Sequence, residues 1–148
     1  MAARNKTRES REEEILRAAD SILQKVGVQN FTIDQVVEEL GVAKGTFYKY
    51  YQSKDDILTA VGARALRLLL SYFKASSSDL SLSHNIFKSI IMSCYEYQEA
   101  NSRYFELIVY MERPGFTGEF PGYLAVSSDL TNYIVGLLEA LQEMGTIR

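Results

Sequence analysis

The sequence predicts an all-helical fold, because apolar residues recur at the three-to-four-residue spacing of a helix along most of the chain. Both prolines, Pro114 and Pro121, come late, so helices before them are not interrupted. A length of 148 residues, with 47% hydrophobic and 24% charged residues, is typical of one domain or of a small domain joined to a second. We therefore expect a folded, soluble chain.

The first helix is expected over about residues 11–26. Acidic residues at 12–14 suit the positive N-terminal end of a helix dipole, and Gly27 offers a left-handed position at which the helix can stop. One face of the segment is apolar and is formed by Ile15, Ala18, Ala19, Ile22, Leu23 and Val26.

The second helix is expected over residues 33–40, between two capping signals. Thr32 and Gln35 have the spacing of a capping box, in which each side chain accepts a hydrogen bond from the backbone N–H of the other. Phe31 is placed to pack over the start of this helix, and Gly41 is placed to close it.

A short third helix is expected over about residues 44–50, and it must pack on its neighbours because it is too short to be stable alone. Val42 and Phe47 can face inward, while the outward positions hold Lys44, Thr46, Tyr48 and Lys49. A fourth helix begins after the capping residue Ser53 and runs to about residue 74, where a serine-rich stretch ends it.

Three further helices are expected over about residues 83–100, 102–112 and 121–144. Pro121 suits the first turn of the last helix. The apolar residues of that helix alternate by four and three positions, which is typical of a seam between helices, and they are Leu130, Ile134, Leu137, Leu141 and Met144.

The composition disfavours several classes of protein. One histidine and one cysteine form no cluster of metal ligands, and no common catalytic or nucleotide-binding motif is present, so we expect no enzyme, no metal and no cofactor. The cysteine, Cys94, is expected to be a buried small residue. No apolar run reaches the ~18 residues of a membrane span, and no apolar segment follows the basic N-terminus, so we expect a cytoplasmic location.

Charge is unevenly distributed along the chain. Residues 1–54 hold nine basic and eight acidic side chains, whereas the remainder holds seven basic and eleven acidic ones. Residues 41–54 contain no acid but three lysines, Lys44, Lys49 and Lys54. Two helices joined by a tight glycine turn, the second short and basic on its outer side, are typical of a helix-turn-helix that enters the major groove of DNA. The alternative interpretation is a helical hairpin with a solvated charged face.

The segment over about residues 10–60 resembles the DNA-binding domain of the TetR family of transcriptional regulators. The resemblance is carried by F-T-I-D-Q-V at 31–36 and by L-G-V-A-K-G-T-F-Y-K-Y-Y-Q-S-K-D-D-I-L at 40–58. It implies an N-terminal arm and DNA-binding domain at 1–54, a linking helix and boundary at 55–78, and a helical regulatory domain at 79–148. Family members usually continue for two further helices, so the regulatory domain is expected to be shortened at its C-terminal end.

The resemblance implies seven DNA-contacting residues, which are Thr32, Lys44, Gly45, Thr46, Tyr48, Lys49 and Lys54. Lys44 would read a base edge, and Thr46 would contact a base methyl group or a phosphate. The Tyr48 hydroxyl and the Lys54 ammonium would contact phosphates, and Thr32 would contact one through its hydroxyl or through the free backbone N–H groups nearby. Phosphate contacts supply affinity that depends on salt.

Three other features of the DNA-binding segment follow from the resemblance. Gly45 would allow the helix backbone to approach its neighbour or the DNA. Ala43 stands where the family often has serine, so the third helix is expected to lack a side-chain cap worth ~1 kcal/mol. The arm residues Arg4, Lys6 and Arg8 would extend into a minor groove, with a disordered solubilising tail as the alternative.

The resemblance further implies a repressor that binds a palindromic operator as a homodimer and that a small effector molecule releases from the DNA. Aromatic residues of the second half provide candidates for the effector site, namely Phe87, Tyr95, Tyr104, Tyr110 and Tyr123, although ordinary core packing is the alternative for them. A helical protein–protein adaptor that has kept the hairpin without binding DNA is the alternative function.

Overall fold

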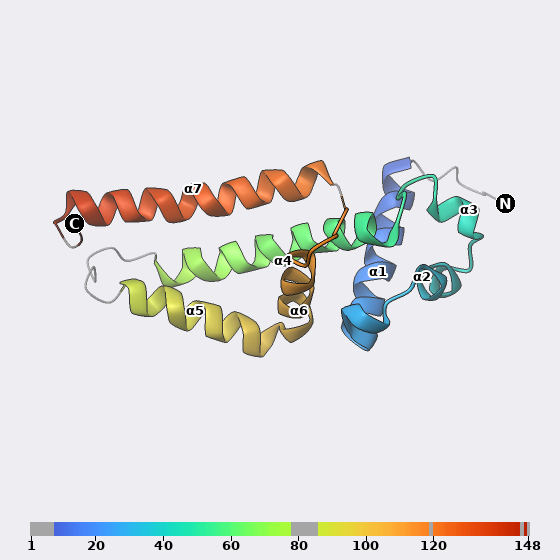
Figure 1. Ribbon diagram of the computed structural model, residues 1–148, viewed down its shortest axis with the longest axis horizontal. Helices are drawn as coiled ribbons and strands as arrows, with labels where there is room; N and C mark the ends of the chain where they lie inside the picture. Colours follow the sequence, from blue (N-terminus) through green and yellow to red (C-terminus); the bar gives the residue numbers. More distant parts are fainter. Residues whose placement is uncertain (1–7, 78–85, 119, 146, 148) are drawn as a thin grey trace.

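The computed structural model describes residues 8–77, 86–118, 120–145 and 147, and the ordered elements among them are all helices. In chain order these are α1 (Arg8–Asn30), α2 (Ile33–Leu40), α3 (Lys44–Phe47), α4 (Lys54–Ser76), α5 (Ile86–Ala100), α6 (Ser102–Met111) and α7 (Pro121–Glu143). Helices α1, α2 and α3 gather at one end, and the long α4 leaves them to lie between α5 and α7 (Figure 1). The predicted all-helical fold, with a helix-turn-helix unit followed by a helical region, is confirmed.

Helix α1 is longer than predicted and bends at the glycine that was expected to end it. Gly27 has φ 74° and ψ 165°, so the predicted positive φ is present, but the chain resumes helical geometry as far as Asn30. The α1 face predicted to be apolar is buried in the core, from Ile15 to Leu23.

Helix α2 has the predicted caps at both ends. The Thr32 hydroxyl accepts a hydrogen bond from the Gln35 backbone N–H at 3.3 Å, and the Gln35 side chain accepts one from the Thr32 backbone N–H at 2.9 Å. Gly41 closes the helix in the left-handed region with φ 62°. Both caps involve residues three or four positions apart, so the local sequence determines them.

Helix α3 ends at Phe47, three residues earlier than predicted, and Ala43 provides no side-chain cap. The helix ends early because two aromatic side chains four positions apart are both buried. Phe47, its last residue, is fully buried, and Tyr51 is only 4% exposed. The backbone N–H groups of Tyr50 and Tyr51 both donate to the Phe47 carbonyl oxygen, at 2.9 and 3.2 Å, in the turn that brings this about. Ser53 then caps α4 by accepting from the Asp56 N–H at 3.1 Å.

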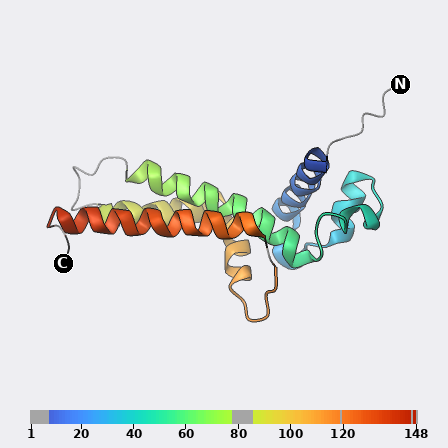
Figure 2. The ribbon, with the colours of Figure 1, turned by 90° about the horizontal axis from the view of Figure 1, so that it is seen from above.

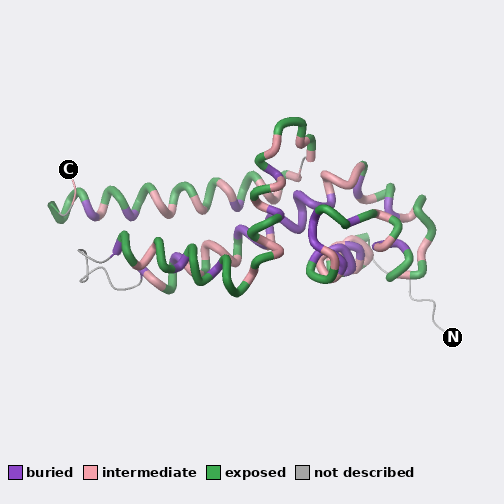
Figure 3. Tube along the Cα trace, turned by 60° about the horizontal axis from the view of Figure 1, so that its bottom comes forward, coloured by how far each residue is buried: buried purple, intermediate pink, exposed green. Residues whose placement is uncertain are grey.

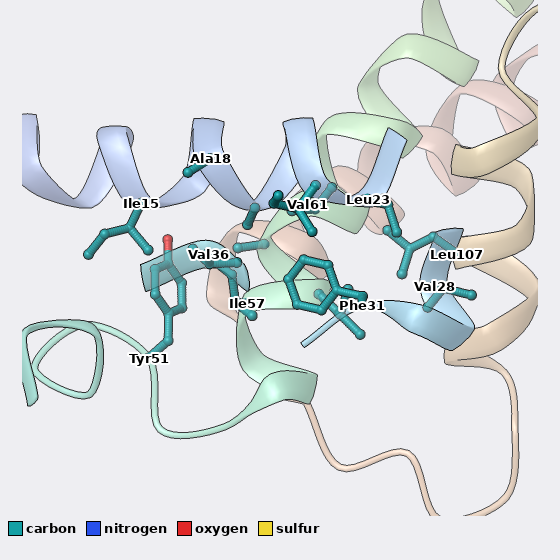
Figure 4. Close-up of a cluster of buried hydrophobic side chains, with 14 of the residues drawn as sticks. Ile15, Ala18, Leu23, Val28, Phe31, Val36, Tyr51, Ile57, Val61 and Leu107 are labelled. Carbon is teal, nitrogen blue, oxygen red and sulfur yellow. The ribbon is translucent and has the colours of Figure 1, made fainter. Parts of the chain in front are cut away.

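One hydrophobic core joins the N-terminal helices to the start of α4 and to α6 (Figure 4). Phe31, Phe47, Ile57 and Val61 are among its fully or almost fully buried members, and Leu107 of α6 belongs to the same cluster. The packing of the helix-turn-helix unit is therefore continuous with that of α6.

The C-terminal helices share a smaller cluster of buried residues than the N-terminal unit. Leu137 and Leu141 of the predicted α7 seam are buried against Ile86 of α5, whereas Met144 is 48% exposed. Seen from above, α4, α5 and α7 run side by side, while α6 and the loop after it project away from them (Figure 2). Exposed positions recur along the whole of α5 and α7, between buried and intermediate ones (Figure 3). Cys94 of α5, predicted to be buried, is exposed.

Within the described residues, no helix is both long and apolar enough to cross a membrane.

Candidate nucleic-acid interface

The turn between α2 and α3 directs the polar side of α3 outward. The Gly41 and Val42 N–H groups donate to the carbonyl oxygens of Glu38 and Val37, at 3.1 and 3.0 Å, which fixes the chain reversal. Phe47 then anchors α3 in the core, with its ring 5.8 Å from that of Tyr51. Since one side of this single-turn helix is anchored, its remaining side chains are presented to solvent.

Most of the candidate DNA-contacting residues lie together on this exposed side. Lys44, Gly45 and Lys49 are exposed, Tyr48 is 46% exposed, and Thr46 is half-buried. The Tyr48 ring rests edge-on against the Phe47 ring with a centroid separation of 5.5 Å, which leaves its phenol at the surface. This exposed surface therefore combines lysine ammonium groups, hydroxyl groups and a glycine whose backbone is open to solvent.

The carboxylate of Asp34 lies beside this surface, although nothing in the sequence pattern pointed to it. Asp34, in the first turn of α2, pairs with the Lys44 ammonium at 2.6 Å, and this hydrogen bond raises the pKa of Lys44 above its usual range. The two residues are ten positions apart, so the acid-free run at 41–54 gave no sign of their contact. Thr32 caps the same turn of α2 that carries Asp34, and it is exposed.

Lys54 is the candidate that the structure separates from the others. Its ammonium donates to the Val28 carbonyl oxygen at 3.3 Å and lies 5.9 Å from the ring centroids of both Phe31 and Tyr110. The side chain thus bridges the end of α1 and α6, and it is half-buried rather than displayed beside α3. A phosphate contact by Lys54 requires its ammonium to leave these partners.

Gly45 faces open space in the described part of the subunit. A Cβ atom added at this position would meet no heavy atom within 4 Å, and Gly45 is not among the glycines with positive φ. Gly62 of α4 provides a contrast, because a Cβ there would lie 2.5 Å from the Met111 side chain.

A polar network ties α1 to both α4 and α6. Arg64 pairs with Glu13 at 2.7 Å and with Asp20 at 3.4 Å, and the Tyr104 hydroxyl donates to the Asp20 carboxylate at 2.9 Å. Burial and, second, the hydrogen bond to Asp20 together raise the pKa of Tyr104 to about 12. Hydrogen bonding to Arg17 lowers the pKa of Glu13.

The five aromatic candidates for an effector site do not converge. Phe87 and Tyr95 are 42% and 56% exposed on α5, and Tyr104 is held by Asp20. Tyr110 packs under the Arg113 guanidinium, 4.2 Å from its ring centroid. Of the five, only Tyr123 lines a cavity of about 490 Å³ beside the start of α4, whose other lining residues are Thr59, Gly118, Phe120, Pro121 and Leu124.

The arm predicted to enter a minor groove lies mostly outside the described residues. Arg4 and Lys6 are not described, and Arg8 is exposed at the first position of α1.

Comparison with known proteins agrees with the helix-turn-helix geometry. Residues 15–61 match the family model described as bacterial regulatory proteins, tetR family. HTH-type transcriptional regulators of Staphylococcus aureus strains USA300 and NCTC 8325 are each 22% identical over 107 residues, covering 64% of this chain and 58% of theirs. The chain therefore spans somewhat more than half the length of these curated relatives.

Two solved structures share the fold. A protein of unknown function from Rhodococcus sp. RHA1 superposes with a TM-score of 0.74 at 18% identity, over 98% of this chain and 74% of its own. A TetR family protein from Vibrio parahaemolyticus gives a TM-score of 0.60 at 18% identity, over 91% of this chain and 71% of its own. The similarity of fold extends well beyond the helix-turn-helix into the C-terminal helices.

Proposed function

We propose that this chain, whose residues 15–61 match the family model of the tetR bacterial regulatory proteins, is a transcriptional repressor that binds a palindromic operator as a homodimer. The observation that carries the proposal is the exposed side of α3. A single helical turn anchored by the buried Phe47 presents Lys44, Tyr48 and Lys49 to solvent. A major groove ~12 Å wide admits such a helix.

In the proposed complex, side chains of α3 divide between base edges and phosphates. Lys44 reads a guanine edge after its ammonium leaves Asp34, and Thr46 contacts a thymine methyl group or a phosphate. Tyr48 and Lys49 bind phosphates on one side of the groove. Gly45 allows the backbone of α3 to approach the duplex, since no side chain separates them.

Residues of α2 and α4 contact the phosphates on the other side of the groove. Thr32 donates its hydroxyl proton to a phosphate, because the same oxygen already accepts from Gln35 and its proton is available. Lys54 provides a further phosphate contact when its ammonium leaves the Val28 carbonyl oxygen. The DNA-contacting unit at 1–54, the linking helix and boundary at 55–78 and the regulatory region at 79–148 then have separate tasks.

A homodimer is proposed because one α3 helix reads only one half-site. Two copies present their α3 helices ~34–36 Å apart on one face of the duplex, which doubles the contacts and gives the operator its two-fold symmetry. A small effector that binds the form with a different α3 spacing would lower operator affinity by shifting the population.

The proposal is tested by selecting bound duplexes from a random DNA pool with the full chain, followed by titration of the selected sequence at several salt concentrations. We expect a palindromic consensus, and affinity that falls with salt as expected for several phosphate contacts. A Lys49→Ala variant should bind the same consensus more weakly with a flatter salt dependence. Recovery of no consensus and no binding to duplex DNA would instead favour the adaptor function.

A further inference from the structure

A second cavity lies between the first half of α1 and the first half of α4. Its volume is about 360 Å³, within the range of small-ligand sites in proteins. Glu12 and Leu16 of α1, Tyr51 of the turn after α3 and Ala60 of α4 are among its lining residues. Phe120, the residue before α7, lines it as well. We call this space the α1 cavity.

The Tyr51 hydroxyl is a buried polar group without a partner. Only 4% of this residue is exposed, and its hydroxyl oxygen forms no hydrogen bond to any described residue. The ring reaches up from the turn after α3 with its hydroxyl directed toward α1 (Figure 4). Buried hydroxyl groups are nearly always paired, because an unpaired one has lost its hydration without replacement. A molecule in the α1 cavity, which Tyr51 lines, can supply the missing partner.

The field at this hydroxyl is negative. Burial, and then the charge of the Glu12 carboxylate, raise the pKa of Tyr51 above its usual range, so the phenol keeps its proton. The charge of Arg64 acts in the opposite direction and more weakly. Glu12 is half-buried and forms no ion pair with a described residue. A cation beside the hydroxyl would therefore gain a carboxylate partner and an oxygen acceptor.

The guanidinium group of Arg64, which also lines the α1 cavity, already pairs with acids of α1. It lies 2.7 Å from the Glu13 carboxylate and 3.4 Å from that of Asp20, which offsets its charge. The other charged side chains of the described lining, apart from Glu13, are two carboxylates and one exposed guanidinium group, from Glu9, Glu12 and Arg67. The described lining therefore favours a cation over an anion.

Apolar surface lies beside these acids. Leu16, Ala60 and Phe120 line the same cavity, so a ligand with an apolar body next to its charged group can remove that body from water against them. A bare metal ion fits less well, since the described residues contain no group of three or more side chains that could hold one. The combination matches an organic cation.

We propose that the α1 cavity binds a small organic cation with a primary ammonium group on an apolar body. The ammonium donates to the Glu12 carboxylate and to the Tyr51 hydroxyl oxygen, and the apolar body packs against Leu16 and Phe120. Binding at this site does not depend on the proposed function, and it is measured without DNA.

Binding is tested with 2-phenylethylamine as the probe, in a methyl and backbone-amide NMR titration of the full chain. Saturable shifts are expected at the methyl groups of Leu16 and Ala60. Leu124 lines the neighbouring cavity of about 490 Å³ and not the α1 cavity, so its methyl groups are the internal control. Saturable shifts at Leu124 without shifts at Leu16 would overturn the assignment of the site.

Charge selection is tested with two probes that keep the phenyl ring and change the polar group. Neutral 2-phenylethanol and anionic 3-phenylpropionate should each bind at least about tenfold more weakly than the amine. Glu12→Gln should remove this preference, whereas Glu38→Gln, which changes an exposed acid of α2 outside the lining, should keep it. Equal affinity of the unmodified chain for the three probes would overturn the proposal.

Tyr51→Phe separates a role of the hydroxyl in binding from a role in folding. The hydroxyl has no partner among the described residues, so its removal should not lower the urea midpoint, whereas affinity for the amine should fall several-fold. Tyr95→Phe, at an exposed position of α5, is the matched control and should change neither quantity. A lower midpoint with unchanged amine affinity would assign the hydroxyl to the fold and overturn its role at the site.

Three charged residues close in sequence to the lining lie outside the described residues, namely Arg4, Lys6 and Glu119. Glu119→Gln and the double variant Arg4→Ala, Lys6→Ala are therefore titrated in parallel, and both should retain the preference for the amine. A preference that is lost in Glu119→Gln but kept in Glu12→Gln would overturn the part proposed for Glu12.

Discussion

The Asp34 carboxylate lies 2.6 Å from the Lys44 ammonium, so the cation proposed to read a base is held by an acid of the preceding helix. This contact orients Lys44 along the surface of the subunit and lowers the positive potential that a duplex meets. In the proposed complex, Lys44 would exchange the Asp34 carboxylate for an acceptor on the DNA, so we expect the pair to affect selectivity more than affinity.

Asp34→Asn should increase duplex affinity about three- to tenfold at low salt, because it removes a negative charge near the phosphates and releases Lys44. The increase should be similar for operator and non-operator duplexes, so the ratio between them falls. Fluorescence anisotropy titrations measure both values. Glu38→Gln, at an exposed position of the same helix, is the control for the change in net charge and should have a smaller effect. An unchanged affinity for Asp34→Asn would contradict a role of Lys44 at the interface.

Gly45→Ala should weaken duplex binding by about tenfold or more without lowering the free energy of unfolding. The added methyl group meets open space within the subunit but would separate α3 from the duplex. Binding titrations and urea denaturation measure the two quantities. Gly136→Ala in α7 is the matched control, because a Cβ there also meets nothing within 4 Å, and it should stabilise the helix by about 0.5–1 kcal/mol without affecting binding. A loss of stability in Gly45→Ala would show that the glycine serves folding.

The sequence could predict contacts between neighbouring residues but not contacts between different helices and loops. The Thr32–Gln35 capping box and the Gly41 cap depend on residues within one turn, so the pattern was sufficient to predict them. The pairs Asp34–Lys44 and Asp55–Arg113 join different elements, and only their packing brings them together. Counting charges along the chain cannot show such contacts.

The contacts of Lys54 are a second case that the sequence could not predict. Its place in the motif predicts a phosphate contact, which stays a prediction, but gives no sign that the ammonium lies on the Val28 carbonyl oxygen and near two aromatic rings. The early end of α3 has a similar origin, because the burial of Tyr51 outweighs the local helical pattern.

Lys49→Ala and Lys54→Ala should both weaken duplex binding and each reduce the slope of log affinity against log salt by about one. They should differ in stability. Lys49 is exposed and forms no ion pair with a described residue, so its loss should leave the urea midpoint unchanged. Lys54 loses its hydrogen bond to Val28 and its ring contacts, so its midpoint should fall. A lower midpoint with an unchanged salt slope would assign Lys54 a purely structural role.

Thr32→Ala should lower the free energy of unfolding by about 1 kcal/mol, because the Gln35 N–H loses its capping oxygen. Thr32→Ser keeps the hydroxyl and should restore both stability and duplex affinity. Urea denaturation and anisotropy titrations of the two variants separate the cap from the phosphate contact. If Thr32→Ala were as stable as the unmodified chain, the capping box would not contribute in solution.

Stability should fall at high pH through Tyr104. Its pKa is raised to about 12 in the folded chain, mainly by burial and then by its hydrogen bond to Asp20, whereas an unfolded tyrosine titrates near pH ~10. Because the folded state favours the neutral phenol, this contribution is fully present below the unfolded value and is lost as the pH rises from there through the folded value. Urea denaturation at a series of pH values in this window measures the loss.

Tyr104→Phe should be less stable at neutral pH, since Asp20 loses a donor, and its stability should decline less steeply with rising pH. Other buried tyrosines titrate in the same region, so the informative quantity is the difference between the two chains at each pH. A difference that stays constant across the window would mean that Tyr104 titrates alike in the folded and unfolded states. A difference that narrows as the pH rises would show that the hydrogen bond from α6 to α1 depends on the protonated phenol, and would make Tyr104 one of the residues by which α6 holds the helix-turn-helix unit in place.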